Sequence, residues 1–287
     1  MHVLNDGKPI VFKAAFLELR RRLKEMPPTE VGEWQSQKID MPMREMLHVA
    51  FEMHIPPGAT HLGEITGARL PWAEDHFLER VGGEPLNPSP SEAWWPFREK
   101  KNGETNASHK SEGAAFSHTY PERMWPKWAG PIYEEMENSN SLDWTPREGI
   151  RFEYGDLNDV VNQLVRSPNT RQAYLPIWFP EDTGAVHGKR VPCTLGYHFI
   201  IRDGSLDMSY FMRSTDLLRH FQDDIYLAGR LMQWMVMRIN DVSDEMDYPY
   251  DTPLQVGNLI FHTANMHIFD GDVPLIEFWE SQGKTWF

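Results

Sequence analysis

The chain contains one cysteine, Cys193, which follows a proline in the segment Arg190-Val191-Pro192-Cys193. A single cysteine excludes an internal disulfide and a CxxC metal site, so Cys193 is either a small buried hydrophobic residue or a working thiol. A thiolate is a strong nucleophile, and cationic neighbours increase the thiolate fraction by lowering the pKa of the thiol. Cys193 is therefore a candidate for covalent catalysis, provided that the fold brings charged groups to it.

Charged residues that could serve such a thiol follow it along the chain, in Arg213-Ser214-Thr215-Asp216 and then in Gln222-Asp223-Asp224. Arginine is suited to holding a phosphate, and a carboxyl group can accept or, when protonated, donate a hydrogen bond. An alternative interpretation of Asp224 is an ordinary residue of a helix N-terminus, where the helix dipole favours negative charge.

Composition narrows the class of ligand. The chain has 287 residues and a formal net charge of -14, and its longest basic run is Arg20-Arg21-Arg22. Nucleic-acid binding is therefore disfavoured, whereas a small anion held by a few buried arginines is compatible with an acidic protein. No signal-like N-terminus and no apolar stretch of about 20 residues occurs, so we expect a cytoplasmic protein without a membrane contact.

Familiar ligand-binding motifs are missing from the sequence. No GxGxxG, P-loop, GxSxG, HExxH or EF-hand pattern occurs, which removes the usual support for dinucleotide, nucleoside triphosphate and serine-hydrolase chemistry. The 12 histidines are scattered, and we expect no metal site.

The elements that must position the candidate residues are clearest in the second half. Residues 157–165 have apolar side chains at helical spacing, and residues 173–179 resemble an edge strand because they contain Pro176. Asp203-Gly204 lies between two alternating segments and predicts a β-hairpin. Residues 216–239 are too apolar for a surface helix, which predicts a buried central helix, and NLIFH and MHIF predict two further short strands.

The first half is less regular. Residues 14–24 and 43–53 are predicted to be amphipathic helices. Residues 84–130 are predicted to be a long, partly ordered segment, whose most polar part is a loop insertion at 98–113. We expect a single domain over residues 1–287, with an α/β (α+β) fold.

Around Cys193 the sequence resembles the thymidylate synthase family. The resemblance rests on Pro192-Cys193, a strand pair, Arg213-Ser214-x-Asp216, and a polar residue at 224, where thymidylate synthases have asparagine. Weaker matches extend it to about residues 40–270; they are Arg171 in SPNTRQ, His267 in MHIF, Glu45 in REML, Trp94-Trp95, and Tyr120 in TYPERMW.

The resemblance implies a fold, a reaction and partners. The fold is a large mixed β-sheet with a buried central helix and flanking helices, in a homodimer whose Arg171 is contributed across the interface. The co-substrate is 5,10-methylenetetrahydrofolate, and the substrate is a pyrimidine nucleotide. The implied catalytic residues are Cys193, which adds to C6 of the pyrimidine, Glu45, Tyr120 and Asp224.

The resemblance also assigns binding residues. The nucleotide would be held by Arg171, Arg213, Ser214, Asp224, His267 and His198, with Lys13 as a substitute for a missing N-terminal arginine loop. The folate would be held by Asp216, Trp94 and Trp95. Glu45 on an amphipathic helix, and either tryptophan, could equally be a surface or packing residue.

The residue at position 224 indicates whether the bound pyrimidine is cytosine or uracil. Cytosine presents an amino donor at N4 and an acceptor at N3, which a carboxyl group can match when it is protonated or shares a proton. Asp224, together with Thr194 after the cysteine, resembles the phage deoxycytidylate hydroxymethylases, which points to 5-hydroxymethylation of dCMP or CMP. Methylation or hydroxymethylation of dUMP remains an alternative.

Four departures from the family pattern leave another class of function open. Gln172 replaces the second arginine of the phosphate-site pair, and Phe269 replaces the sugar-binding tyrosine. His198 stands where the family has glutamine, and His220 stands where it usually has glycine. Loss of the tyrosine hydroxyl is compatible with a ribonucleotide, and weaker phosphate binding is compatible with an inert nucleotide-binding homologue.

Overall fold

The computed structural model describes twelve segments of the chain. These are residues 2–3, 11–30, 33–34, 37–38, 41–94, 100–101, 104–105, 116, 118–129, 155–185, 191–243 and 252–285. Most of the predicted polar insertion at 98–113, Trp95, and the C-terminal Trp286-Phe287 lie outside these residues.

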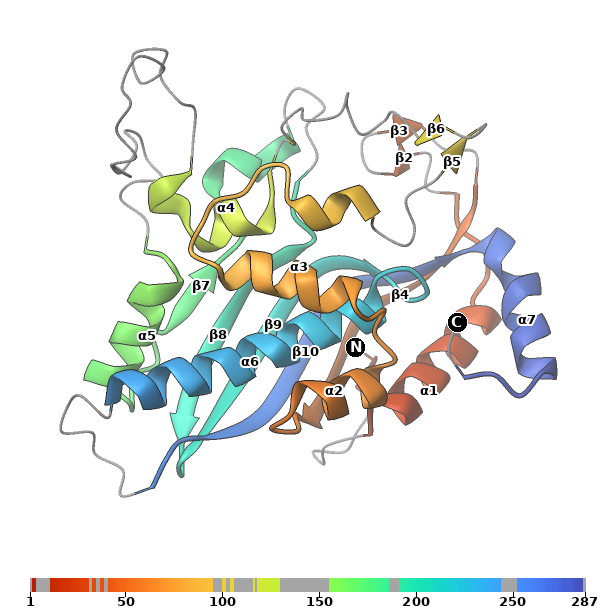
Figure 1. Cartoon of the computed structure of the whole chain (residues 1–287). Coiled ribbons are helices and arrows are strands. Elements are labelled where there is room, and N and C mark those ends of the chain that lie inside the picture. The colour runs from red at the N-terminus through yellow and green to blue at the C-terminus, as the bar shows by residue number, and fades with distance from the viewer. Residues whose placement is uncertain are drawn as a thin grey trace, which may run out of the picture.

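A six-stranded mixed sheet forms the centre of the molecule, in the order β1-β4-β10-β9-β8-β7 (Figure 1). Its strands are β1 (His2–Val3), β4 (Met43–His54), β7 (Tyr174–Pro176), β8 (Thr194–Arg202), β9 (Ser205–Asp216) and β10 (Gln255–Phe269). The central strand β10 runs parallel to β9 and antiparallel to β4. Two small hairpins lie apart from the sheet, β2 (Glu33–Trp34) with β3 (Gln37–Lys38), and β5 (Lys100–Lys101) with β6 (Glu104–Thr105).

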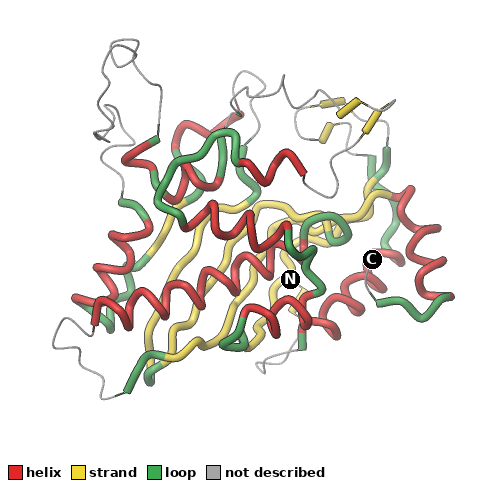
Figure 2. The backbone as a smooth tube through the Cα atoms, viewed as in Figure 1, coloured by secondary structure: helices red, strands yellow, loops and turns green. Residues whose placement is uncertain are grey.

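Helices cover one face of this sheet (Figure 2). The α-helices are α1 (Phe12–Glu25), α2 (Ala59–Thr66), α3 (Trp72–Val81), α4 (Tyr120–Met124), α5 (Leu157–Arg166), α6 (Phe221–Ser243) and α7 (Val273–Ser281). Short 3-10 helices are η1 (Pro90–Trp94), η2 (Pro126–Trp128), η5 (Pro180–Ala185) and η6 (Asp270–Asp272). None of the described helices is long and apolar enough to cross a membrane.

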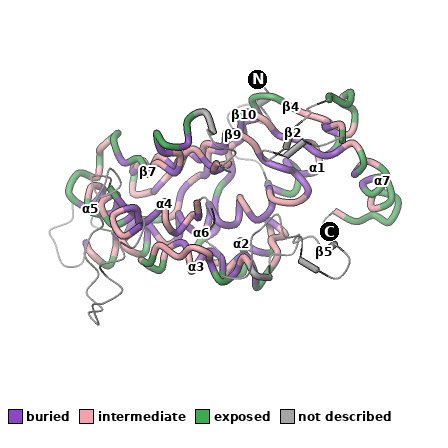
Figure 3. Tube along the Cα trace, turned by 90° about the horizontal axis from the view of Figure 1, so that it is seen from above, coloured by how far each residue is buried: buried purple, intermediate pink, exposed green. Residues whose placement is uncertain are grey.

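The long helix α6 lies between the sheet and the outer helices α2, α3 and α5. Most of its residues are buried (Figure 3). Phe221, Ile225, Leu231 and Met235 are each at most 1% exposed, so α6 is apolar around most of its circumference because it is enclosed on both sides. The prediction of a mixed sheet with a buried central helix is confirmed. The helix begins at Phe221 rather than at Asp216, because β9 continues to Asp216.

Two predictions of secondary structure are wrong. Residues 43–53 form β4 and not a helix: they pair with β10 over their whole length, and Val49, Phe51 and Met53 alternate into the core. Tertiary pairing thus overrides the helix propensity of Leu, Met, Glu and Ala. The segments NLIFH and MHIF are not separate strands but parts of the single strand β10, which is paired on both sides.

The other predicted elements are confirmed. α1 ends at Glu25, before Pro27, and α5 begins after Asp156, whose side chain caps it. β8 and β9 form the predicted hairpin, with Asp203 and Gly204 at φ of 50° and 74°, the backbone conformation that a two-residue turn of this kind requires. The strand predicted at 173–179 is shorter, Tyr174–Pro176, and lies at the edge of the sheet as Pro176 requires.

Candidate active site at the start of β8

Cys193 lies immediately before β8, beside Arg213 of β9. The Arg213 backbone N–H donates to the Cys193 carbonyl at 2.8 Å, and its guanidinium Nη2 is 3.7 Å from the Cys193 sulfur. The same guanidinium also donates to the carbonyl oxygens of Pro192 and Val191, at 2.8 and 3.2 Å. These contacts hold the cation in place next to a half-buried thiol. The predicted pairing of Cys193 with Arg213 is therefore present, and it suits a thiolate.

A chain of hydrogen-bonded hydroxyl groups begins at the next residue, Thr194. The Thr194 hydroxyl is 3.1 Å from the Tyr120 hydroxyl and 3.0 Å from that of Tyr210, and the Tyr210 ring stacks on Tyr197 with centroids 4.9 Å apart. Burial raises the pKa of Tyr120, and the charge of Cys193 adds to the shift. The Tyr120 phenol is therefore neutral at physiological pH and can donate a hydrogen bond close to the sulfur.

Asp224 lies in the first turn of α6 and belongs to the same group of residues. It is partly buried and accepts a hydrogen bond from the Thr215 hydroxyl at 3.0 Å. Burial raises its pKa to about 7, with the charges of Asp223 and Asp216 adding to the shift, while Thr215 and Arg80 oppose it. Its charge and that of Cys193 both raise the pKa of the Tyr120 hydroxyl, so the two predicted catalytic groups are electrostatically linked through Tyr120.

A fixed cation in this group, Arg80 of α3, was not predicted. It is 6% exposed, and its guanidinium carbon lies 3.9 Å from the centre of the Tyr120 ring. Its Nη2 donates to Nε2 of His76 at 2.9 Å, while its Nε is buried without a hydrogen-bond partner among the described residues. The sequence signal was the spacing of His76 and Arg80 on one face of a helix that also carries Trp72 and Phe77.

A chain of hydrogen bonds through His76, Ser91 and Glu79 holds Arg80 in place. Burial, and then the charge of Arg80, lower the pKa of His76 to about 4, so the imidazole is neutral and its Nε2 accepts from Arg80. Its Nδ1–H must then donate to the Ser91 hydroxyl at 2.7 Å, which donates in turn to Glu79 at 2.5 Å. The guanidinium is thereby fixed between the Tyr120 ring and α3.

Replacing Arg80 with glutamine is expected to raise the pKa of Asp224 above about 7, because the arginine charge favours the ionised carboxylate. The measurement is an NMR titration of labelled aspartate carboxyl groups, with Asp224 assigned by Asp224→Asn. Arg123→Gln is the matched control, because Arg123 is also buried and lies 4.6 Å over a ring, that of Phe179, but pairs with Asp182. An unchanged Asp224 pKa in Arg80→Gln would contradict an electrostatic role for Arg80.

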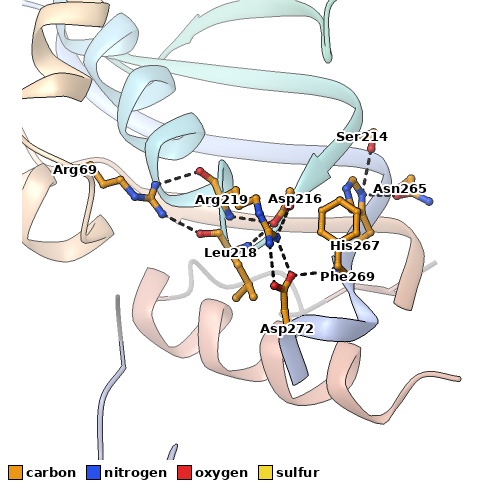
Figure 4. Close-up of polar contacts among 9 residues, drawn as sticks. All are labelled: Arg69, Ser214, Asp216, Leu218, Arg219, Asn265, His267, Phe269 and Asp272. Atoms are coloured by element: carbon orange, nitrogen blue, oxygen red, sulfur yellow. Dashed lines mark hydrogen bonds and ion pairs between the residues drawn. The ribbon is translucent and has the colours of Figure 1, made fainter. Parts of the chain in front are cut away.

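A second group of predicted residues lies at the edge of the sheet where β9 and β10 end and β4 begins. Figure 4 shows His267 of β10 between Ser214 and Asn265, with its Nδ1 at 3.3 Å from the Ser214 hydroxyl and 3.0 Å from the Asn265 amide oxygen. Glu45 joins them from β4, since its carboxylate accepts from the Asn265 amide nitrogen at 2.7 Å. The structure thus brings Glu45 to His267 and Ser214. β4 is separated from β8, which follows Cys193, by β10 and β9.

Asp216 is bound within its own turn. One carboxylate oxygen accepts the backbone N–H groups of Leu218 and Arg219, and the other accepts from the Arg219 guanidinium at 3.0 Å. Arg219 also makes two hydrogen bonds to Asp272, at 2.7 and 2.8 Å, and lies 4.7 Å over the Phe269 ring. Because Asp216 is 2% exposed, a folate contact at this carboxylate requires Arg219 to move.

The remaining predicted residues lie elsewhere. Arg171 is exposed in a pocket-lining loop at 167–172, and its carbonyl is 3.0 Å from His198 Nε2 at the edge of the sheet. His198 follows buried Tyr197 along β8, so the alternation of the strand turns it to the face opposite α6. Lys13 is exposed on α1. Trp94 ends η1, but its side chain and all of Trp95 lie outside the described residues.

Comparison with known proteins identifies the family. The profile of the thymidylate synthase family matches residues 110–279. A thymidylate synthase from Vesicomyosocius okutanii is 22% identical over 184 residues, covering 61% of this chain and 58% of that protein. Another, from Staphylococcus haemolyticus, is 24% identical over 135 residues, covering 47% of this chain and 37% of that protein. The chain therefore spans between 37% and 58% of the length of these relatives. Since the family match covers more than half of the chain and includes Cys193, Arg213 and Asp224, the chain belongs to the thymidylate synthase family.

Proposed function

We propose that this protein transfers a one-carbon unit from 5,10-methylenetetrahydrofolate to C5 of a cytidine monophosphate, deoxy or ribo, and adds water to give the 5-hydroxymethyl product. The observation that carries the choice of base is Asp224, a partly buried carboxyl group whose pKa is raised to about 7. An ionised aspartate could only accept hydrogen bonds, whereas a protonated one can donate to N3 of cytosine and accept from its N4 amino group. Uracil, with N3–H and O4, presents the opposite pattern.

The protonated carboxyl group also supports the covalent step. When the Cys193 thiolate forms a bond to C6, the electron pair of the C5–C6 double bond is displaced and negative charge builds up in the ring. Transfer of the Asp224 proton to N3 neutralises that charge and leaves C5 as an enamine-like nucleophile. Arg80 lies where it stabilises the aspartate anion that this transfer creates. Tyr120, as a neutral donor beside Thr194, is suited to ordering a water molecule or the ring.

The phosphate and the folate are assigned from the family resemblance. Arg213 and Ser214 would hold the phosphate together with Arg171 from a partner subunit, and His198 would support the nucleotide. Methylenetetrahydrofolate supplies a carbon at the oxidation level of formaldehyde, and Asp216, Trp94 and Trp95 would bind it. No metal is required by this scheme.

A homodimer is supported by the sheet face that α6 does not cover. Phe211 and His262 stack there with ring centroids 5.1 Å apart, and neither is fully buried by the described residues. Leu47 of β4 is 54% exposed. An apolar, partly open sheet face of this kind suits an isologous contact with a second copy of the chain, and it would bring Arg171 of one protomer toward the site of its partner.

Product mass tests the proposal. The protein is incubated with methylenetetrahydrofolate and with dCMP, CMP or dUMP in turn, and a gain of CH2O on a cytidine nucleotide is the expected result. A gain of CH2 on dUMP would instead show a thymidylate synthase, and a gain of CH2O on dUMP a hydroxymethylase of the other base. No product with any of the three would favour an inert nucleotide-binding homologue, the alternative that Gln172 and Phe269 keep open.

A further inference from the structure

The hydrogen bonds around His267 have a fixed direction. The Asn265 amide nitrogen lies 2.7 Å from Glu45, whose carboxylate can only accept a hydrogen bond. The amide must therefore turn its nitrogen to Glu45 and its oxygen to His267, where that oxygen is 3.0 Å from Nδ1. Because an amide oxygen also only accepts, the proton on the imidazole must sit on Nδ1.

The other ring nitrogen, Nε2, is then a free acceptor. Burial lowers the pKa of His267 and keeps the ring neutral; the charges around it are Glu45 on β4, Asp216 and Arg213 on β9, and Arg219 in the following turn. His267 is 5% exposed, and its Nε2 has no hydrogen-bond partner among the residues that the structure describes. A buried acceptor left unpaired is destabilising, so this position favours a ligand that brings a hydroxyl or N–H donor.

We infer that Glu45 is a positioning residue: through Asn265 it fixes the Nδ1–H tautomer of His267, so that Nε2 accepts a hydrogen bond from a sugar hydroxyl of the bound nucleotide. The inference rests on the proposed function for the identity of the ligand. It assigns to Glu45 a role different from the acid-base catalysis expected from the sequence, because Glu45 is tied to the sugar-side residues and β10 and β9 lie between its strand and β8.

The direction of the relay gives selectivity. Phosphate and carbonyl oxygens only accept hydrogen bonds and would be rejected by an unprotonated Nε2, whereas a hydroxyl can donate. The opposite tautomer would reverse this preference. With phenylalanine at position 269, in place of the family's tyrosine, His267 carries a larger share of hydroxyl recognition at this end of the sheet.

The test uses Glu45→Gln in the full-length protein. A glutamine can donate as well as accept, so Asn265 loses its fixed orientation and both tautomers of His267 become accessible. The matched control is Glu52→Gln, because Glu52 lies on the same strand and accepts from Asn258 at the same 2.7 Å. Nitrogen-15 NMR of labelled histidine is expected to show Nδ1–H with bare Nε2 in the wild type and in Glu52→Gln, and a mixture in Glu45→Gln. A wild-type ring protonated on Nε2, or a Glu45→Gln ring that keeps the wild-type tautomer, overturns the inference.

Binding provides the second readout, with CMP compared with 2′-deoxy- and 3′-deoxy-CMP by calorimetry. The wild type and Glu52→Gln are expected to lose roughly tenfold in affinity when the recognised hydroxyl is removed, and Glu45→Gln to lose less than about threefold. An equal loss in Glu45→Gln and wild type overturns this inference alone. Failure of the wild type to bind any of these nucleotides overturns the proposed function as well, and the NMR result distinguishes the two cases.

Discussion

Replacing Cys193 with serine is expected to lower turnover at least about 1000-fold. A serine hydroxyl ionises far above neutral pH, and the Arg213 guanidinium 3.7 Å from the sulfur cannot produce a useful population of alkoxide. Without an anionic nucleophile the pyrimidine C6 is not attacked, and C5 stays unreactive. The measurement is the rate of product formation by mass spectrometry, with methylenetetrahydrofolate and the preferred nucleotide.

The serine variant should otherwise behave as the wild type. Cys193 is half-buried and its backbone, not its sulfur, makes the short 2.8 Å contact with Arg213, so the unfolding midpoint and nucleotide affinity should change little. Retained turnover in Cys193→Ser would rule out covalent activation by this residue. Loss of folding would be visible as a lowered unfolding midpoint and would be separated from loss of chemistry in that way.

Replacing Asp224 with asparagine is expected to reverse base preference. The asparagine amide can donate to O4 of uracil and accept from N3–H, but it has no proton to give to N3 of cytosine. The ratio of kcat/KM for dCMP to that for dUMP should fall by roughly 100-fold or more, because the mismatched base leaves buried polar groups unpaired. Thr215→Val is the control, since it removes the 3.0 Å hydrogen bond to Asp224 without changing the carboxyl group. Unchanged selectivity in Asp224→Asn would remove the argument for cytosine.

The same substitution has a stability effect whose size depends on pH. The folded-state pKa of Asp224 is raised from 3.8 to about 7, so the folded chain binds a proton that the unfolded chain releases, and stability falls as pH rises through this window. Above pH 7 this contribution lowers the free energy of unfolding of the wild type by roughly 4 kcal/mol relative to its value at low pH. Asp224→Asn should therefore be more stable than the wild type at pH 8 in urea unfolding, and the gain should largely disappear at pH 4.

The sequence was most informative where local chemistry decides structure. Asp203-Gly204 specifies a tight turn whatever surrounds it, and the order of Cys193, Arg213 and Asp224 along a hairpin and helix largely determines their proximity. The first half was harder. The segment 43–53 contains good helix formers, and only its pairing with β10 makes it a strand, so Glu45 was placed on the wrong type of element.

Arg80 shows the other limit of sequence reasoning. Its helix has an ordinary amphipathic pattern, which places Arg80 on the same face as Trp72 and Phe77 but does not show what the guanidinium contacts there. Those contacts depend on the Tyr120 ring, His76 and Ser91, which come from three separate parts of the chain. Asp216 was located correctly on β9, but its capture by Arg219 depends on Asp272 beyond the end of β10.

The pairing of β4 with β10 also bears on how the protein comes to be folded. It joins Met43 to Phe269 and His54 to Asn258, contacts of very large sequence separation, which slow the formation of a native sheet. During synthesis β4 has no partner on this side until β10 has left the ribosome, and until then its apolar residues need protection from aggregation. The relay from Glu45 to His267 crosses this pairing, so it cannot form until β10 has been made, whereas Cys193, Arg213 and Asp224 all precede β10 in the chain.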